Sequence, residues 1–412
     1  MNKPLPEDPM MRQLVQMARR HQMTRRAALA GAGATAAALA LTACSPAGSK
    51  GQKTLTPAKD VSATEKTVIW HNWDLYMDED AKGNHPTLDR FTEETGISVE
   101  YKIEIDDNDS YFGKVKDQLA LGADIGADVA CPTEWMVARW VNNGYVQKFN
   151  DANIPNKKNL QAAYLGAEFD PKREYSMPYQ GILGGITYNK EAYKKLTGKD
   201  APATLDDLFV PELKGRIGVL KEMRDTIGLI LLSQGITLSD PKSLTSDAFM
   251  NAIDYFKGKV ADLNIKIKGQ GYSVDFENGD TVAAIAWSGD TVQMNLSAGR
   301  EKYGFVIPDS GATITADEFV IPMGATHKAN AEALINFYYD PKNAAELAAW
   351  VNYVTPVVGA QEEAMKIDPK LASNQLIFPS AEFLANTHAW RSLTPSEEQT
   401  FTKAWQSVQV GA

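Results

Sequence analysis

A chain of 412 residues, 44% hydrophobic and 23% charged, has the composition of an ordinary globular protein. It is too long for a single compact core, so we expect two lobes. Its formal net charge of −10 argues against nucleic acid as a partner, because phosphates require a basic surface, whereas cations remain reasonable partners.

The first segment of the chain has the pattern of an export signal. Five arginines fall within residues 1–26, and the Ala- and Gly-rich run AALAGAGATAAALALTAC follows them. That run is too short and too weakly apolar to form a stable membrane span. The pair Arg25–Arg26 is compatible with twin-arginine export, and the general secretory route stays open.

The string LTAC, residues 41–44, resembles the lipobox of bacterial lipoproteins. The resemblance implies that residues 1–43 are removed and that Cys44 is lipidated, which would anchor the protein in the periplasm or on the outer face of the cytoplasmic membrane. The removed segment carries six basic and two acidic side chains, so the net charge would become −14. Cys131 would then have no disulfide partner. We expect residues 44–65, small and polar, to form a flexible tether.

Strands and helices alternate from Thr67 onward. The patterns predict strands at 68–73, 97–105 and 127–133, and helices at 85–96, 110–122 and 134–144. Such a β-α-β-α-β order indicates a parallel sheet, in which ligands bind beyond the carboxyl ends of the strands. The segments 73–76 and 133–135 follow two such ends, so we expect them to face a cleft.

Strand-to-helix patterns recur at 215–235 and at 277–299, which indicates a second α/β lobe. The Gly-rich stretch YSMPYQGILGGITYNK, residues 175–190, is a predicted crossing between the lobes, and further crossings are expected at 316–325 and 352–361. The fold class predicted is therefore α/β, a two-lobed hinged clamshell with multiple interlobe crossings.

An ordered set of motifs spans nearly the whole chain after Thr67: NWDLY, FTEETGISVEY, DVACPTEW, YSMPY, ELKGRIGVLKEMRD, NGDTVAAIAWSGD, ADEFVIP and NYVTP. Together they resemble the spermidine/putrescine-binding receptors of bacterial polyamine ABC importers. The resemblance implies a periplasmic-binding-protein-like fold, with residues 66–186 and 314–362 in lobe 1. Residues 187–313 and 363–412 would form lobe 2.

Carried over position by position, the resemblance implies a ligand site of rings, hydroxyls and acids. Its members would be Trp73, Asp74, Tyr76, Thr133, Glu134, Trp135, Glu222, Asp225, Trp287, Asp290, Asp317 and Tyr353. These residue types suit a polyamine, because each ammonium group needs a carboxylate and each methylene stretch packs well on a flat ring. Asp74 and Glu134 depart from the family, where a hydroxyl is common at both positions.

The implied function is a non-enzymatic receptor, expected to be a monomer, that delivers a polyamine to a membrane permease driven by an ATPase. Membrane contact is expected through the lipid anchor only, and we expect no cofactor and no metal site, because the histidines are scattered. Two alternatives stay open. Arg391, if it lies in the cleft, would suit another cationic or zwitterionic solute, and paired acids would suit an exported hydrolase.

Overall fold

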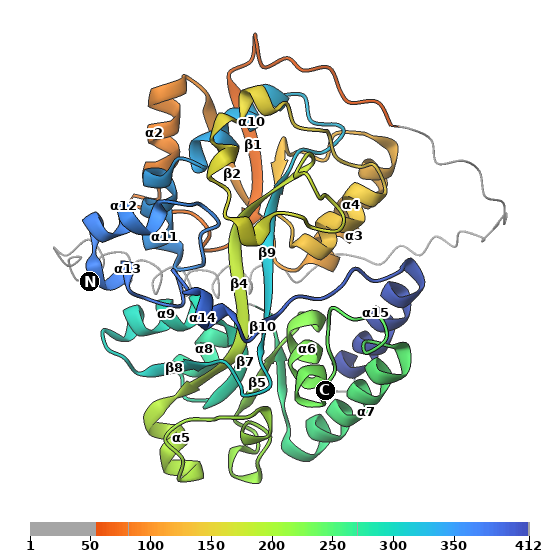
Figure 1. Cartoon of the computed structure of the whole chain (residues 1–412), viewed down its shortest axis with the longest axis vertical. Helices are drawn as coiled ribbons and strands as arrows, with labels where there is room; N and C mark the ends of the chain where they lie inside the picture. Colours follow the sequence, from red (N-terminus) through yellow and green to blue (C-terminus); the bar gives the residue numbers. More distant parts are fainter. Residues whose placement is uncertain (1–54, 81, 270, 411–412) are drawn as a thin grey trace, which may run out of the picture.

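The computed structural model describes residues 55–80, 82–269 and 271–410, which form two lobes one above the other (Figure 1). The predicted export segment, residues 1–43, and Cys44 lie outside the described residues. Within the described ranges, no helix combines the length and the apolar character that a membrane crossing requires.

The upper lobe of Figure 1 begins with the predicted β-α-β-α-β order. Its elements are β1 (Thr67–Trp73), α2 (Pro86–Thr95), β2 (Ser98–Ile105), α3 (Asn108–Leu121), β3 (Val129–Ala130) and α4 (Glu134–Asn142). β1 lies between β2 and β3 and runs parallel to both, as predicted. Gly96 ends α2 in the left-handed conformation (φ 71°), which confirms its expected capping position.

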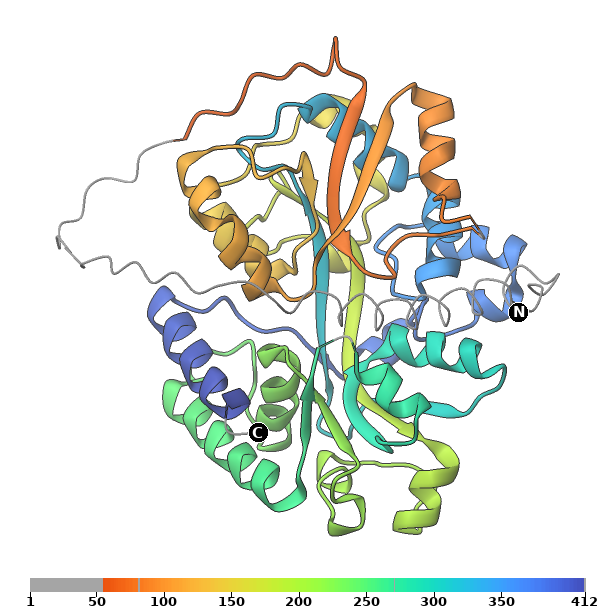
Figure 2. The same ribbon diagram turned by 180° about the vertical axis from the view of Figure 1, so that it is seen from behind.

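Two long antiparallel strands, β4 (Ser176–Asn189) and β9 (Ala312–Val320), run side by side from one lobe into the other (Figure 2). Both were predicted as crossings. Gly184 is the residue at which β4 changes partner, because it pairs with Thr313 of β9 and with Trp287 of β7 (Ala283–Trp287). A Cβ there would lie 2.3 Å from the Thr313 hydroxyl, so only glycine fits.

The lower lobe contains the two strand-to-helix units predicted at 215–235 and 277–299, together with further elements that were not predicted. The strands besides β7 are β5 (Ile217–Leu220), β6 (Lys266–Lys268) and β8 (Tyr303–Val306). The helices are α5 (Lys190–Thr197), α6 (Met223–Ser233), α7 (Ser246–Leu263), α8 (Tyr272–Glu277), α9 (Ser288–Ala298) and α15 (Pro395–Val410). The sheet is continuous through both lobes, in the order β2-β1-β3-β9-β4-β7-β5-β6, with β8 on β4 and β10 (Thr387–His388) on β9.

The remaining helices lead the chain back toward the lower lobe: α10 (Lys328–Tyr338), α11 (Pro341–Val351), α12 (Ala360–Ile367), α13 (Pro369–Ala372) and α14 (Ala381–Leu384). The stretch 352–361, expected to hold a third crossing, forms no strand. Val354 and Val357 form only isolated bridges, with Gly181 and Leu160. The expected lobe boundary at 362/363 falls inside α12, which packs on α11, and the chain next joins the sheet at β10.

Short 3₁₀ turns complete the connections: η1 (Asp151–Asn153), η2 (Pro155–Asn159), η3 (Ala162–Tyr164), η4 (Leu205–Asp207) and η5 (Pro211–Leu213).

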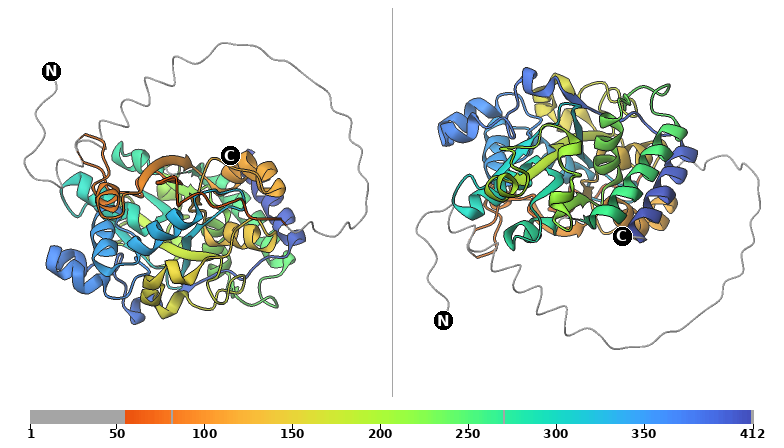
Figure 3. Two further views of the ribbon diagram at one scale, coloured as in Figure 1. Left: turned by 90° about the horizontal axis from the view of Figure 1, so that it is seen from above. Right: turned by 90° about the horizontal axis from the view of Figure 1, so that it is seen from below.

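Aromatic packing fixes the positions of the crossing strands and of the last helix. The ring of Tyr179 on β4 lies 5.3 Å from that of Trp70 and 4.7 Å from that of Phe319 on β9. Phe401 of α15 stacks on Phe249 of α7 at 3.8 Å, and Figure 3 shows these two helices side by side. α15 is therefore part of the lower lobe.

The segment expected to be a flexible tether is docked on the upper lobe over the part that is described. The amides of Ala58 and Val61 donate to the carbonyls of Met323 and Thr326 at 2.9 and 2.8 Å. These bonds satisfy backbone groups that a free tether would leave to water. The prediction of flexibility is thus wrong for residues 55–65, because backbone hydrogen bonds hold this segment on the upper lobe. Residues 44–54 lie outside the described ranges.

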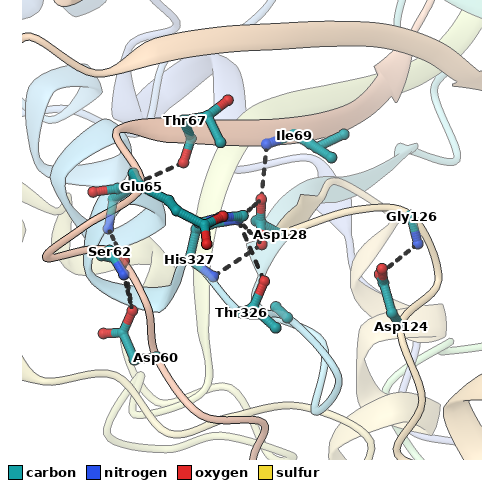
Figure 4. Close-up of polar contacts among 12 residues, drawn as sticks. Asp60, Ser62, Glu65, Thr67, Ile69, Asp124, Gly126, Asp128, Thr326 and His327 are labelled. Atoms are coloured by element: carbon teal, nitrogen blue, oxygen red, sulfur yellow. Dashed lines mark hydrogen bonds and ion pairs between the residues drawn. The ribbon is translucent and has the colours of Figure 1, made fainter.

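A histidine between two carboxylates holds the end of this segment (Figure 4). His327 Nδ1 lies 3.0 Å from Asp128 Oδ2, and its Nε2 lies 3.1 Å from Glu65 Oε2. Asp128 also accepts hydrogen bonds from the amides of Ile69 and His327. Burial lowers the pKa of His327, but the hydrogen bonds with Glu65 and Asp128 outweigh it and raise the pKa above its usual value.

The His327→Gln variant should be less stable than the parent by about 1–2 kcal/mol at acidic pH. A histidine with a raised pKa stabilises the fold fully below its unfolded value of about 6.5, and this contribution is lost as the pH rises through the folded value. The deficit in urea unfolding should therefore be larger at about pH 6 than at about pH 8.5. Asp60→Asn, in the same segment, is the control, because Asp60 has a lowered pKa and stays ionised at both. An equal deficit for His327→Gln at both pH values would contradict the pairing.

Candidate functional site

A cavity of about 990 Å³ lies between the two lobes. Side chains from the end of β1, the start of α4, β9, the start of α6, the end of β7 and α15 line it. Ten of the twelve predicted site residues are on its wall: Trp73, Tyr76, Thr133, Glu134, Trp135, Glu222, Asp225, Trp287, Asp317 and Tyr353. Asp74 and Asp290 are not. Its volume is at the upper end of the usual range for small-molecule sites.

The turn after β1 decides which of its side chains reach the cavity. Leu75 has a positive φ of 62°, a conformation that is unfavourable for a leucine and that redirects the chain within one residue. Trp73 and Tyr76 line the cavity, whereas Asp74 accepts a hydrogen bond from the Leu75 amide at 2.9 Å. The structure therefore does not support Asp74 as a cavity residue; its carboxylate closes the turn instead.

Asp317 lies in the wall of the upper lobe, 1% exposed, within a fixed set of hydrogen-bond donors. The Thr133 hydroxyl donates to its Oδ1 at 2.7 Å, and the Tyr76 hydroxyl is a second partner. Asn108 orients Thr133 by donating to its hydroxyl at 2.8 Å. Burial raises the pKa of Asp317 to about 7, although Thr133 and Tyr76 act in the opposite direction, and the charge of Asp225 raises it further.

Asp225 faces the cavity from the first turn of α6 in the lower lobe. The indole Nε1 of Trp287 and the hydroxyl of Thr313 each donate to it at 3.2 Å. Burial raises its pKa to about 6 despite these two donors. The absence of a side chain at Gly184 makes room for this group, since a Cβ there would lie 2.9 Å from Asp225 Oδ1.

Two more carboxylates, Glu134 and Glu222, lie at the starts of α4 and α6. Burial raises the pKa of each to about 8, and neighbouring carboxylates raise it further: Glu318 and Asp317 for Glu134, and Asp225 for Glu222. Like charges that face one another out of water favour protonation. Arg173 and Arg224 lower the pKa of Glu134 without outweighing these effects, so both glutamates favour the protonated form until a ligand cation approaches them.

Asp290, the second predicted residue that does not line the cavity, supports one that does. Its carboxylate accepts hydrogen bonds from the hydroxyls of Tyr353 at 2.7 Å and Tyr272 at 2.6 Å. Tyr353 is on the cavity wall, with its ring 5.1 Å from that of Tyr76. We therefore assign Asp290 to the positioning of Tyr353, since two tyrosine hydroxyls already occupy its oxygens.

The arginines around the cavity all have carboxylate partners. Arg391 forms two hydrogen bonds with Glu397, at 2.6 and 3.1 Å, and so does not project a free guanidinium into the cleft. Arg173 pairs with Glu318 at 2.8 Å, and both Arg139 and Arg224 pair with Glu398. Sequence reasoning missed Arg139, Arg224 and Glu398. No local pattern marks them, because they come together only when α15 packs beside α4 and α6.

The acids of the cavity differ from the arginines in this respect. Glu134, Glu222, Asp225 and Asp317 form no ion pair with a basic side chain of the described ranges, although all four line the cavity. Trp73, Tyr76, Trp287 and Tyr353 line the same space with flat rings. Such a set can bind an organic cation, with carboxylates for its charge and rings for its methylene groups.

Comparison with known proteins agrees with this arrangement. The family model for bacterial extracellular solute-binding proteins matches residues 87–374, and the chain belongs to that family. The putrescine-binding periplasmic protein PotF of Escherichia coli is 29% identical over 376 residues, covering 85% of this chain and 93% of the relative. Spermidine/putrescine-binding periplasmic protein 1 of Haemophilus influenzae is 27% identical, covering 90% and 96%.

A solved structure described as a putative spermidine/putrescine ABC transporter from Listeria monocytogenes has the same fold. Its TM-score is 0.72 at 26% identity, with coverage of 84% of this chain and 100% of that one. The predicted α/β two-lobed class and the predicted family are thereby confirmed.

Proposed function

We propose that this protein is the receptor of an ABC importer that captures a polyamine, such as putrescine or spermidine, in the cleft between its lobes. One observation carries the proposal: four carboxylates and four aromatic rings face one cavity, and the carboxylates lack cationic partners among the described side chains. The names of the relatives, putrescine- and spermidine-binding proteins, support the same class of ligand.

The distribution of acids between the lobes suits a ligand with separated charges. Asp317 and Glu134 belong to the upper side of the cavity, and Asp225 and Glu222 belong to the lower side at the start of α6. A diamine or longer polyamine contacting both sides would neutralise carboxylates that otherwise repel one another. Ligand charge would thus favour closure of the lobes around it.

The paired state of Arg391 argues against the zwitterionic alternative. A ligand carboxylate would have to displace Glu397 from Arg391, or Glu398 from Arg224, before it met a guanidinium. Glu134, Glu222, Asp225 and Asp317 line the cavity without an ion pair among the described residues, against one such base, Lys403. This excess of acids favours a purely cationic solute. No feature of the described residues favours the hydrolase over a receptor, and the relatives named above are binding proteins.

The finer points of delivery belong to the same proposal. In this proposal, the closed receptor docks on a membrane permease that is driven by an intracellular ATPase. The lipobox-like string before Cys44 supports a lipid anchor on the outer face of a membrane, which would keep a monomeric receptor near its permease.

Isothermal titration calorimetry tests the proposal directly. Putrescine and spermidine should give saturable heat at about pH 8 and low salt, and added salt should weaken the binding because the contacts are between charges. Butane-1,4-diol, with the same chain and no charge, is the matched control and should give none. Absence of binding by any diamine or polyamine would refute the polyamine assignment, and saturable binding of a γ-amino acid alone would favour a zwitterion receptor.

A further inference from the structure

A glutamate of the last helix joins the two lobes at one side of the cleft. Glu398 lies in the first turn of α15, which packs with α7 in the lower lobe. Its Oε1 accepts a hydrogen bond from Arg139 Nη2 at 2.9 Å, and its Oε2 accepts one from Arg224 Nη2 at 2.7 Å. Arg139 is on α4 of the upper lobe and Arg224 is on α6 of the lower lobe, so one carboxylate is shared between the lobes.

The ring of Trp135 is the second part of this contact. The guanidinium carbon of Arg224 lies 4.1 Å from the centre of the ring, and that of Arg139 lies 5.4 Å from it. Trp135 is on α4, so the shorter of these contacts again joins the lower lobe to the upper. Trp135, Arg139, Arg224 and Glu398 are called the interlobe latch below.

Each side of the latch is held firmly within its own lobe. The carbonyl of Arg224 accepts a hydrogen bond from Trp390 Nε1 at 3.0 Å, and Phe401, one turn beyond Glu398, stacks on Phe249 of α7. On the other side, Trp140 next to Arg139 is fully buried in the upper lobe. A hinge motion that opens the cleft would therefore separate Arg139 from Glu398 and Trp135 from Arg224, rather than carry them along together.

The charged side chains of the interlobe latch are sufficiently shielded from solvent for their ion pairs to contribute to the stability of the contact. The exposed fractions are 22% for Arg139, 11% for Arg224 and 17% for Glu398. A second pair, Lys221 with Asp107 at 3.0 Å, also links the lobes, but the lysine is 43% exposed and its contribution is correspondingly screened. The shared carboxylate is thus the main ionic contact that we assign to the closed arrangement.

We propose that Glu398 is a positioning residue which stabilises the closed arrangement of the lobes and thereby sets the affinity and the residence time of the ligand. A contact present only in the closed arrangement shifts the equilibrium toward it, and apparent affinity rises with the closed fraction. The effect on ligand affinity rests on the proposed function, whereas the effect on lobe closure does not.

Glu398→Gln tests the latch, with Glu397→Gln as its matched control. Glu397 is the adjacent residue on the same helix, but its partner Arg391 is fixed within the lower lobe, where it also donates to the Leu244 carbonyl. Small-angle X-ray scattering of the protein without ligand should give a larger radius of gyration for Glu398→Gln than for the parent. Glu397→Gln should match the parent.

Binding gives the second readout. Putrescine affinity measured by calorimetry should fall about 10-fold in Glu398→Gln, mainly through faster dissociation in stopped-flow fluorescence. The control for affinity is Asp74→Asn, outside the cavity wall, which should change it by less than about twofold; Glu397→Gln is the control for scattering alone, because it frees the guanidinium of Arg391 on the cavity wall. Arg139→Gln removes the upper partner and should reproduce both effects; combined with Glu398→Gln it should add little more, because both substitutions break one contact.

Equal radii of gyration for the parent, Glu398→Gln and Arg139→Gln would overturn the proposal, and so would an equally large increase in the radius of gyration of Glu397→Gln. If no amine binds the parent, the proposed function is wrong, but the scattering comparison still shows whether Glu398 stabilises the closed arrangement of the lobes. Should Glu398→Gln fail to fold, shown by its thermal unfolding, Arg139→Gln decides from the opposite lobe.

Discussion

Asp317→Asn is expected to weaken putrescine binding about 100-fold, because it removes one partner of a buried charge pair. Asn is close in size and can still accept the hydrogen bond that Thr133 donates at 2.7 Å, so the wall of the cavity keeps its shape. The loss would therefore report charge rather than packing. Calorimetric titration of parent and variant at about pH 8 measures it, at a pH above the raised pKa of Asp317 of about 7.

The same variant should not lose stability in the absence of ligand. Burial disfavours the ionised form of Asp317, so replacing it by a neutral group should leave the free energy of unfolding unchanged or higher above pH 7. Asp74→Asn is the control, since Asp74 lies outside the cavity wall, and it should bind as the parent does. Normal binding by Asp317→Asn, or a large loss in Asp74→Asn, would contradict this map of the site.

Putrescine affinity should rise steeply as the pH increases from about 5.5 to about 8, by roughly 100-fold if two carboxylates must ionise. Burial raises the pKa of Asp225 to about 6 and that of Asp317 to about 7, so both hold protons at the lower pH. A cation binds the ionised forms, and binding therefore releases protons. Calorimetry in buffers of different ionisation enthalpy would count them.

The direction of this pH dependence follows from the raised pKa values of Asp225 and Asp317. Without ligand, each of these acids costs stability as the pH rises from its unfolded value through its folded one, because the protonated form is the favoured one in the fold. A bound amine reverses that cost, so the increase in melting temperature caused by putrescine should grow with pH. A flat profile between pH 5.5 and 8, or proton uptake on binding, would contradict the assignment of these carboxylates.

Much of the fold could be read along the chain. The alternation from Thr67 to Asn142 predicts each strand and helix of that part of the upper lobe, because its strands alternate or are apolar and its helices have one buried apolar face. The crossing strands β4 and β9 were also predicted, at 175–190 and 316–325, although β9 begins at Ala312 and is not a simple apolar run, since it contains Asp317 and Glu318. The stretch expected to hold the third crossing, 352–361, forms two isolated bridges, with Gly181 and Leu160, in place of a strand.

Two predicted site residues, Asp74 and Asp290, do not line the cavity, for reasons that the order of residues along the chain does not reveal. Asp74 is placed outside by the positive φ of Leu75, a conformation that the residue type does not announce. Asp290 follows a strand end as expected, yet Tyr272 and Tyr353 reach its carboxylate from two other parts of the chain. Both outcomes depend on local geometry or on distant partners.

Hydrophobic periodicity, a local property, was sufficient for the strand-and-helix order from Thr67 to Asn142 and for the strand-to-helix units at 215–235 and 277–299. The family and most of the acids and rings that face the cleft came instead from the ordered set of motifs, whose resemblance to a known receptor family implied a role for each position. Packing in three dimensions was needed to show that Arg391 is neutralised by Glu397, that residues 55–65 dock on the upper lobe, and that Glu398 joins Arg139 to Arg224. These contacts join segments that no local pattern relates, because charges pair according to how helices and lobes pack.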